Sequence, residues 1–202
     1  MIYIHRTEEP NFWKMFKRKH PGIHYDDLQT TEEGRSLRQE IRKYNIDQQH
    51  GLCAYCCKRI NLEKSINEHI KPRGQGKYSN QSMDYNNIVA CCRDEGGDAT
   101  CSAAKENNYS SQFISPLDED CESYFEYYKN GEVVSDSPDG EYTINLLNLN
   151  SYRLRKSRAA QLRNCESIND LDLIKHIFLE PDSENRLEPF VDIIKFFYSS
   201  EN

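Results

Sequence analysis

The sequence predicts an α+β domain with a metal-binding knuckle between two mainly helical extensions. Three observations indicate this. A helical pattern spans residues 30–51, two short segments with strand character lie at 65–70 and 87–92, and six of the eight cysteines fall between residues 53 and 101. Segregated helices and short strands are typical of the α+β class. The cysteines then predict what holds the central part together.

The N-terminal extension, residues 1–50, is predicted to be helical. One helix is expected over residues 10–19, with three large apolar side chains on one face: Phe12, Met15 and Phe16. The second, over residues 30–51, is the stronger prediction. Either Thr30 or Thr31 can cap its N-terminus, because both are hydroxyl residues just before the helical pattern.

Residues 51–115 are predicted to form the knuckle core, and residues 116–202 a hairpin followed by helices. Asn130-Gly131 lies between strand-like flanks, which favours a type I′ turn. Two further helical patterns occupy residues 143–167 and 187–199.

The composition limits the class of protein. The chain is 37% hydrophobic with a mean hydropathy of −0.88, and no run approaches the roughly 20 apolar residues of a membrane span. The first ten residues, MIYIHRTEEP, lack the apolar region of a signal peptide, so a cytoplasmic protein is expected.

The net charge of −7 is unevenly distributed along the chain. Residues 1–80 hold 15 Lys and Arg against 10 Asp and Glu, whereas residues 81–202 hold 11 against 23. Because phosphate contact depends on local charge, the acidic total does not exclude a nucleic-acid partner.

In a reducing compartment, clustered cysteines favour metal binding over disulfides. Cys53 and Cys56 form a C-x-x-C pair, a spacing that lets two thiolates reach one tetrahedral ion. Cys92 and Cys101 are the natural second pair. The prediction is a structural Zn²⁺ held by these four thiolates.

Other arrangements of the cysteines stay open at the level of sequence. Cys57 and Cys91 each neighbour a predicted ligand and compete with it, and Gly96 and Gly97 allow the chain to loop out before Cys101. Free core cysteines are the simple alternative. A redox C-x-x-C is disfavoured, because no thioredoxin-like strand and helix flank it.

The successive motifs CAYC, EHIKPRG, DYNNIVACC and CSAAKEN resemble the HNH endonuclease motif. The closest resemblance is to the PtuB-like HNH proteins of Septu-type and retron-associated anti-phage defence systems. It includes the opening YIHRTEEPNFW and covers the C-terminal part only loosely. The resemblance implies a ββα-metal fold in which a zinc knuckle brackets the active site.

The resemblance also implies the activity and the partners. The implied function is metal-dependent hydrolysis of phosphodiester bonds, with DNA the favoured substrate and RNA such as tRNA the other candidate. The implied partners are an ABC/SMC-like ATPase subunit (PtuA-like) and a retron reverse transcriptase complex. A membrane is not among them.

Carried onto this sequence, the motif assigns roles to three residues. His69 would be the general base, since an ordinary imidazole titrates near neutral pH, at about 6.5. Glu68 would bind the catalytic metal if the strand end frays, because adjacent strand residues otherwise point to opposite faces. Asn87 would orient His69 or the substrate, with Asn86 as the competing choice.

The motif departs from the family after Cys101, where His or Asn is expected and Ser102 stands. A serine hydroxyl is a poor ligand for a divalent metal. Glu106 lies four residues further on and would share a helix face with Ser102, so we predict it as the substitute ligand for a catalytic Mg²⁺ or Mn²⁺. Asn107 and Asn108 are weaker candidates.

Basic residues gather beside the motif and again near the C-terminus. The loop after His69 carries Lys71, Arg73 and Lys77, with Gly74 and Gly76 allowing close approach of a nucleic-acid backbone. A second basic face is expected in residues 143–167, formed by Arg153, Lys156 and Arg163. Each set is either a phosphate contact or a solvated surface.

Two hypotheses assign the protein to different functional classes. The first is an HNH endonuclease. The second is a catalytically impaired zinc-knuckle module that docks on a partner or nucleic acid. Glu68, His69 and Asn87 together favour the enzyme, because a docking module needs none of them.

Overall fold

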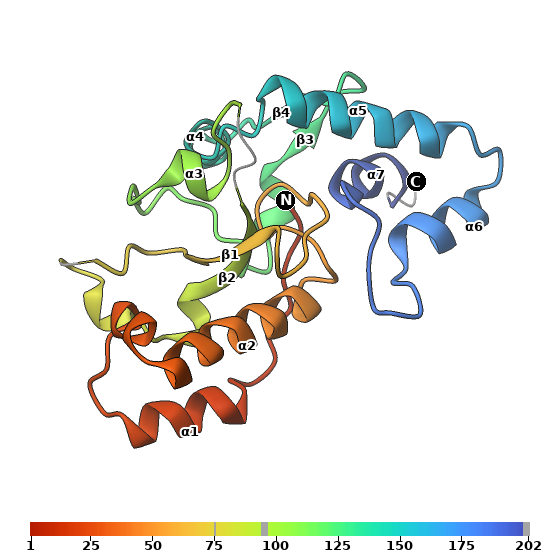
Figure 1. The fold of residues 1–202 in the computed structure, drawn as a ribbon. Helices are drawn as coiled ribbons and strands as arrows, with labels where there is room; N and C mark the ends of the chain where they lie inside the picture. The colour runs from red at the N-terminus through yellow and green to blue at the C-terminus, as the bar shows by residue number, and fades with distance from the viewer. Residues whose placement is uncertain (75, 94–96, 200–202) are drawn as a thin grey trace.

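The computed structural model describes residues 1–74, 76–93 and 97–199. Its centre is a two-stranded antiparallel ribbon (Figure 1). β1 (Ser65–His69) pairs with β2 (Ile88–Cys92) along their full lengths, with the first residue of each strand opposite the last of the other. The predicted strands at 65–70 and 87–92 are confirmed. One end of the ribbon therefore carries Cys92 and the other carries His69.

The N-terminal elements lie on one side of this ribbon (Figure 1). They are α1 (Asn11–Lys19), the 3-10 helix η1 (Tyr25–Thr30) and α2 (Glu32–Gln48). The helix predicted over 30–51 is confirmed, and Thr31 caps it by accepting a hydrogen bond from the Gly34 amide at 3.0 Å. Thr30 belongs to η1 instead.

The buried face of α1 differs from the predicted one. Trp13 and Phe16 are buried, and Trp13 Nε1 donates to the Met83 carbonyl at 3.0 Å, whereas Met15 is 66% exposed. Periodicity along ten residues supports two overlapping apolar stripes. In the structure, the stripe with Trp13 and Phe16 faces the core.

Short elements connect the ribbon to its surroundings. A knuckle at residues 52–59 is closed by a bridge between Leu52 and Arg59. The loop between the strands contains two 3-10 turns, η2 (Ser79–Gln81) and η3 (Tyr85–Asn87), and α3 (Ser102–Lys105) follows β2. These pieces supply the side chains around the ribbon ends.

The predicted hairpin is present, but its turn type is different. β3 (Glu126–Tyr127) pairs with β4 (Val133–Val134). Only Gly131 has a positive φ, at 82°, and its amide donates to the Tyr128 carbonyl at 2.8 Å. A type I′ turn needs positive φ at both central residues, so the prediction of that turn is wrong.

The helical pattern at 143–167 divides into two helices, α4 (Pro138–Leu146) and α5 (Tyr152–Glu166). Asn148, with a φ of 49°, stops the first, and Ser151 caps the second. The last predicted helix is confirmed as α7 (Val191–Tyr198). Between α5 and α7 lie two elements that the sequence did not predict: α6 (Leu171–Ile174) and the π-helix η5 (Lys175–Leu179).

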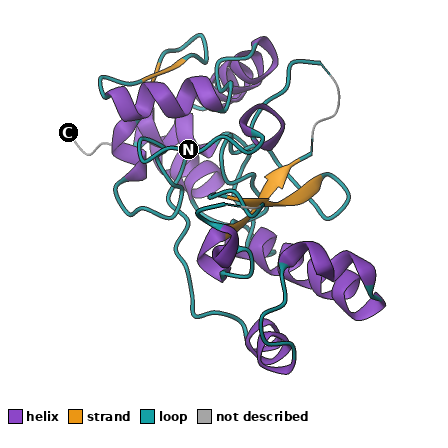
Figure 2. Ribbon diagram, turned by 90° about the vertical axis from the view of Figure 1, so that its left-hand side faces the viewer, coloured by secondary structure: helices purple, strands orange, loops and turns teal. Residues whose placement is uncertain are grey.

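The chain combines helices with two separate two-stranded sheets, and the predicted α+β class is confirmed (Figure 2). One buried cluster contains residues from each of the three predicted segments, among them Ile4, Tyr55, Val89 and Ile193. The division at residues 50 and 115 stays a prediction. Among the described helices, none combines the length and apolar character of a membrane crossing.

Candidate metal centre and active site

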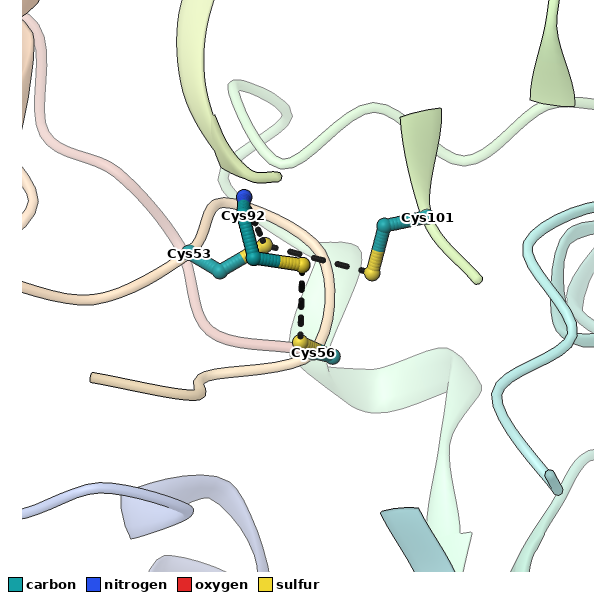
Figure 3. A group of neighbouring side chains, drawn as sticks. All are labelled: Cys53, Cys56, Cys92 and Cys101. Carbon is teal, nitrogen blue, oxygen red and sulfur yellow. Dashed lines mark hydrogen bonds between the residues drawn. The ribbon is translucent and has the colours of Figure 1, made fainter. Parts of the chain in front are cut away.

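Four buried cysteines converge at one end of the ribbon (Figure 3). Cys53 and Cys56 come from the knuckle, Cys92 ends β2, and Cys101 stands directly before α3. All four sulfur atoms lie within 4.8 Å of one another. Segments nearly 50 residues apart in the sequence thus meet at one point. The four cysteines that meet there are the ones predicted as zinc ligands.

The sulfur spacing fits a tetrahedral ion. Cys53 Sγ is 3.9 Å from Cys101 Sγ, and Cys56 Sγ is 3.9 Å from Cys92 Sγ. Zn–S bonds of about 2.3 Å in a tetrahedron place the sulfurs about 3.8 Å apart. Four thiolates are also a donor set that suits zinc. The cluster could therefore hold a metal ion, and zinc fits it.

The competing cysteines lie close to this cluster. Cys91 Sγ is 3.6 Å from Cys53 Sγ, yet among the described residues the mutually close set is the four predicted thiols. Cys57 is buried in the knuckle with a φ of 57°. Gly96 lies outside the described residues, and Gly97 has the positive φ, 99°, that the predicted loop-out uses.

Each thiol in the cluster changes the pKa of the others through hydrogen bonds. Burial alone would raise the pKa of the Cys53 thiol, yet hydrogen bonds from Cys101 and Cys56 hold that pKa well below its usual range. The bond with Cys101 lowers the pKa values of Cys56 and Cys92, but their bonds with Cys53 and their burial outweigh it, and the pKa values of Cys56, Cys92 and Cys101 are all raised. Without a cation, one of the four thiols loses its proton readily, and deprotonation of the other three is unfavourable.

His69 ends β1 at the opposite end of the ribbon. Its Nε2 lies 2.9 Å from the Ser82 carbonyl oxygen, which can only accept, so Nε2 carries the proton. Nδ1 is buried and has no hydrogen-bond partner within the described structure. The Tyr25 ring packs edge-on against the imidazole, at 4.6 Å between centroids. Nδ1 is thus an available acceptor.

Burial lowers the pKa of His69 from 6.5 to about 3, although the bond to the Ser82 carbonyl acts in the opposite direction. The imidazole is therefore neutral across the physiological range. A neutral imidazole with a fixed tautomer can accept a proton, but its pKa lies well below the near-neutral value that was the reason for choosing His69 as the general base, so that reason was wrong.

Asn87 holds the loop that covers His69. Its Oδ1 accepts from the Lys71 amide at 2.7 Å, and its Nδ2 donates to the carbonyls of Lys71 and Gln81 at 3.0 and 3.1 Å. Because Ser82 follows Gln81, these bonds also position the carbonyl that holds His69. Asn86, the competing choice, is exposed.

Glu68 faces away from this loop and toward α3. Lys105 Nζ donates to Glu68 Oε1 at 2.9 Å, and Ser102 Oγ donates to Oε2 at 2.5 Å. Tyr55 Oη lies further off, 3.5 Å from Oε1. β1 stays regular through His69, so the two neighbouring side chains contact different elements.

The predicted catalytic Mg²⁺ or Mn²⁺ does not fit these side chains as they lie. A divalent ion needs free carboxylate oxygens, and both oxygens of Glu68 accept hydrogen bonds from the chain itself. Glu106 is exposed at the end of α3, with a φ of 51°, and no hydrogen bond among the described residues joins it to Glu68. Its role as a ligand stays a prediction.

Lys105 is the residue that sequence reasoning missed. Its side chain is 1% exposed and pairs with a Glu68 side chain that is 8% exposed. The sequence did hold a signal. Positions three and four after Ser102 share its helix face, and a buried carboxylate needs a cation. The sequence-based prediction chose Glu106, at the fourth position, as a metal ligand and did not include Lys105.

The basic loop lies beside the histidine end. Lys71 and Lys77 approach the Tyr78 ring, at 5.8 and 5.2 Å from its centroid. Arg73 instead bonds to Asp26, through Nε and Oδ1 at 2.8 Å. Added Cβ atoms at the predicted glycines, Gly74 and Gly76, would meet open space. On α5, the predicted basic side chains are exposed: Arg153, Lys156 and Arg163.

The two-stranded ribbon, the helix α3 after it, the cysteine cluster and the histidine at the strand end agree with the ββα-metal arrangement that the sequence resemblance implied. No protein-family model matches the chain. The chain is similar to a curated protein named "Retron Vc95 putative HNH endonuclease", from Vibrio cholerae serotype O1 biovar El Tor. The two are 29% identical over 140 residues, which cover 61% of this chain and 66% of the relative.

The chain thus spans just under two thirds of that relative's length. The relative confirms the resemblance to HNH endonucleases, and its name adds a link to retrons. It does not name a substrate, a metal or a partner.

Proposed function

We propose that this protein is an endonuclease of the HNH type that hydrolyses phosphodiester bonds of nucleic acid. The observation that carries the proposal is the state of His69. The Ser82 carbonyl fixes its proton on Nε2, and Nδ1 is left as an unpartnered acceptor. Most buried polar atoms in proteins are paired, so an unpaired buried nitrogen supports a role for this histidine beyond packing.

In this proposal, His69 Nδ1 accepts a proton from a water molecule as the water oxygen attacks the phosphorus. One P–O bond forms, another breaks, and the departing oxygen takes up a proton. Asn87 serves as a positioning residue, because it holds the loop whose Ser82 carbonyl fixes the imidazole. General-base catalysis of this kind contributes about 10²- to 10⁴-fold.

DNA is the favoured substrate, and RNA such as tRNA is the other candidate. Lys71, Lys77 and Tyr78 combine positive charge with an aromatic ring beside the histidine end. That combination suits a nucleic-acid backbone and an unstacked base. The basic face of α5 is a second candidate contact.

The proposed biological role is that of an effector in an anti-phage defence system. The retron in the relative's name supports a retron reverse transcriptase complex as one partner. An ABC/SMC-like ATPase of the PtuA type is the other, by resemblance to Septu-type systems. Structural zinc in the cysteine cluster completes the proposed assembly.

One observation favours the alternative, a zinc-knuckle module that binds without cleaving. Both oxygens of the Glu68 carboxylate accept hydrogen bonds from within the chain. The residue expected to bind the catalytic metal is therefore already occupied by Ser102 and Lys105. In that case the basic loop would serve docking alone.

A cleavage assay separates the two functions. Purified protein, alone and with a candidate ABC/SMC-like ATPase partner, is incubated with supercoiled plasmid or a tRNA pool. The reactions contain Mg²⁺, Mn²⁺ or neither. Cleavage that His69→Gln loses supports the enzyme. If the wild type and His69→Gln both bind the nucleic acid and neither cleaves it under any condition, the protein is the docking module.

A further inference from the structure

A buried ammonium group occupies the centre of the Glu68 pocket. Lys105 Nζ donates to Glu68 Oε1 at 2.9 Å and to the His69 carbonyl at 3.0 Å. The two charged side chains are 1% and 8% exposed. Buried charges are tolerated in proteins when they are paired and hydrogen-bonded, as these are.

The backbone around the cysteine cluster delivers this lysine to its place. Cys101 is held by the other thiols and donates its amide to the Leu147 carbonyl at 2.8 Å. α3 begins directly after it, so Ser102 and Lys105 lie one turn apart on one face. Both point at the same carboxylate, one to each oxygen.

We propose that the Lys105 ammonium takes the place of a divalent cation at Glu68 and excludes Mg²⁺ and Mn²⁺ from this carboxylate. Two departures from the HNH motif then compensate each other. The ligand position after Cys101 holds a hydroxyl that donates to Glu68, and the missing positive charge is supplied by a lysine three residues later.

The physical reason is competition between cations for one carboxylate. A divalent ion would have to displace two hydrogen bonds and approach a fixed positive charge in a pocket closed to water. Lys105 would also have to leave its bond to the His69 carbonyl. Nothing in the described pocket offers a second carboxylate to offset this.

The inference deepens the proposed function, because it states what cation the nuclease site contains. Its test needs no nucleic acid, so its failure is distinguishable from a failure to cleave.

The test measures Mn²⁺ binding to the zinc-loaded full chain by the loss of the free-ion EPR signal. The wild type is expected to show no site at Glu68 tighter than about 1 mM. Lys105→Ala is expected to bind one Mn²⁺ at least tenfold more tightly, about the scale on which one nearby charge shifts an ionic equilibrium. The double variant Lys105→Ala/Glu68→Gln should lose that site.

Lys77→Ala is the matched control. It removes one positive charge from the exposed loop without opening Glu68, and its Mn²⁺ binding should equal that of the wild type. A single micromolar site in the wild type that Glu68→Gln removes would overturn the proposal. Equal Mn²⁺ affinity in wild type and folded Lys105→Ala would overturn it as well. If Lys105→Ala loses its zinc and does not fold, the wild-type titration alone decides.

Discussion

At one end of the β1–β2 ribbon, four buried thiols meet within 4.8 Å of one another. At the other end, the Glu68 carboxylate lies against Lys105 and Ser102, and the His69 imidazole is neutral. Both ends are buried and both are built from residues far apart in sequence. They differ in where the compensating charge comes from.

This difference separates what depends on an ion from what does not. The cysteine end can hold several thiolates only with a cation, so its folding is linked to metal. At the histidine end, the Glu68 carboxylate is satisfied by hydrogen bonds and one ion pair within the chain, and His69 Nδ1 is left without a partner among the described residues. The structure therefore predicts that metal removal unfolds the first end, while the second responds to substitution and to pH.

The largest effect is expected from Cys53→Ser. Structural zinc contributes on the order of 10 kcal/mol to small zinc domains, which is comparable to the whole stability of a domain. We expect zinc to be lost and the knuckle region to unfold, as measured by metal analysis and circular dichroism.

Cys91→Ser is the matched control, since its sulfur lies 3.6 Å from Cys53 Sγ but outside the set of four. It should keep one zinc per chain. Loss of zinc in Cys91→Ser but not in Cys92→Ser would exchange their roles.

Substitution of the proposed base comes next. His69→Gln keeps a side chain that can donate to the Ser82 carbonyl but cannot act as a base. We expect cleavage to fall by about 10²- to 10⁴-fold with the zinc content unchanged. Single-turnover rates measure this.

His24→Gln serves as its control. His24 Nε2 bonds to the Arg73 carbonyl at 2.7 Å, in the same loop, yet takes no part in the proposed chemistry. Its cleavage rate should stay within a factor of a few of the wild type. Full activity in His69→Gln would place the base elsewhere.

Asn87→Ala tests the loop that covers the histidine end. It removes three hydrogen bonds of a buried amide, and each contributes about 1 kcal/mol. We expect a loss of about 2 to 3 kcal/mol in the free energy of unfolding, from urea titration. Asn86→Ala, at an exposed neighbour, should change it by less than about 0.5 kcal/mol. Equal effects would show that Asn87 does not hold the loop.

The smallest effect is a dependence on pH. Burial holds the pKa of His69 at about 3 in the folded state, against about 6.5 when unfolded. The unfolded chain therefore binds the proton first, and stability falls as pH decreases from about 6.5 toward 3.

Between pH 7 and pH 5, this histidine should cost the wild type about 2 kcal/mol of stability. His69→Gln should lack this part of the acid dependence, as compared by urea unfolding at the two pH values. Parallel losses in both proteins would mean that His69 titrates normally.

Local patterns in the sequence predicted both strands of the ribbon, the long helix α2 and the preferred members of the cysteine cluster, while the structure was needed to set Cys57 and Cys91 outside the mutually close four. C-x-x-C spacing, apolar runs and capping residues are short-range signals, and short-range geometry is enough to interpret them. The resemblance to HNH endonucleases rested on the same local motifs.

Only the tertiary structure decided how the histidine end is completed. Lys105 reaches Glu68 across 37 positions, and the Ser82 carbonyl selects the tautomer of His69. Sequence spacing placed Glu106 and Lys105 equally well beside Ser102, and the orientation of α3 buried the lysine and exposed the acid. Such choices depend on which distant groups share a buried space, because burial makes an unpaired charge costly. No local pattern records that pairing.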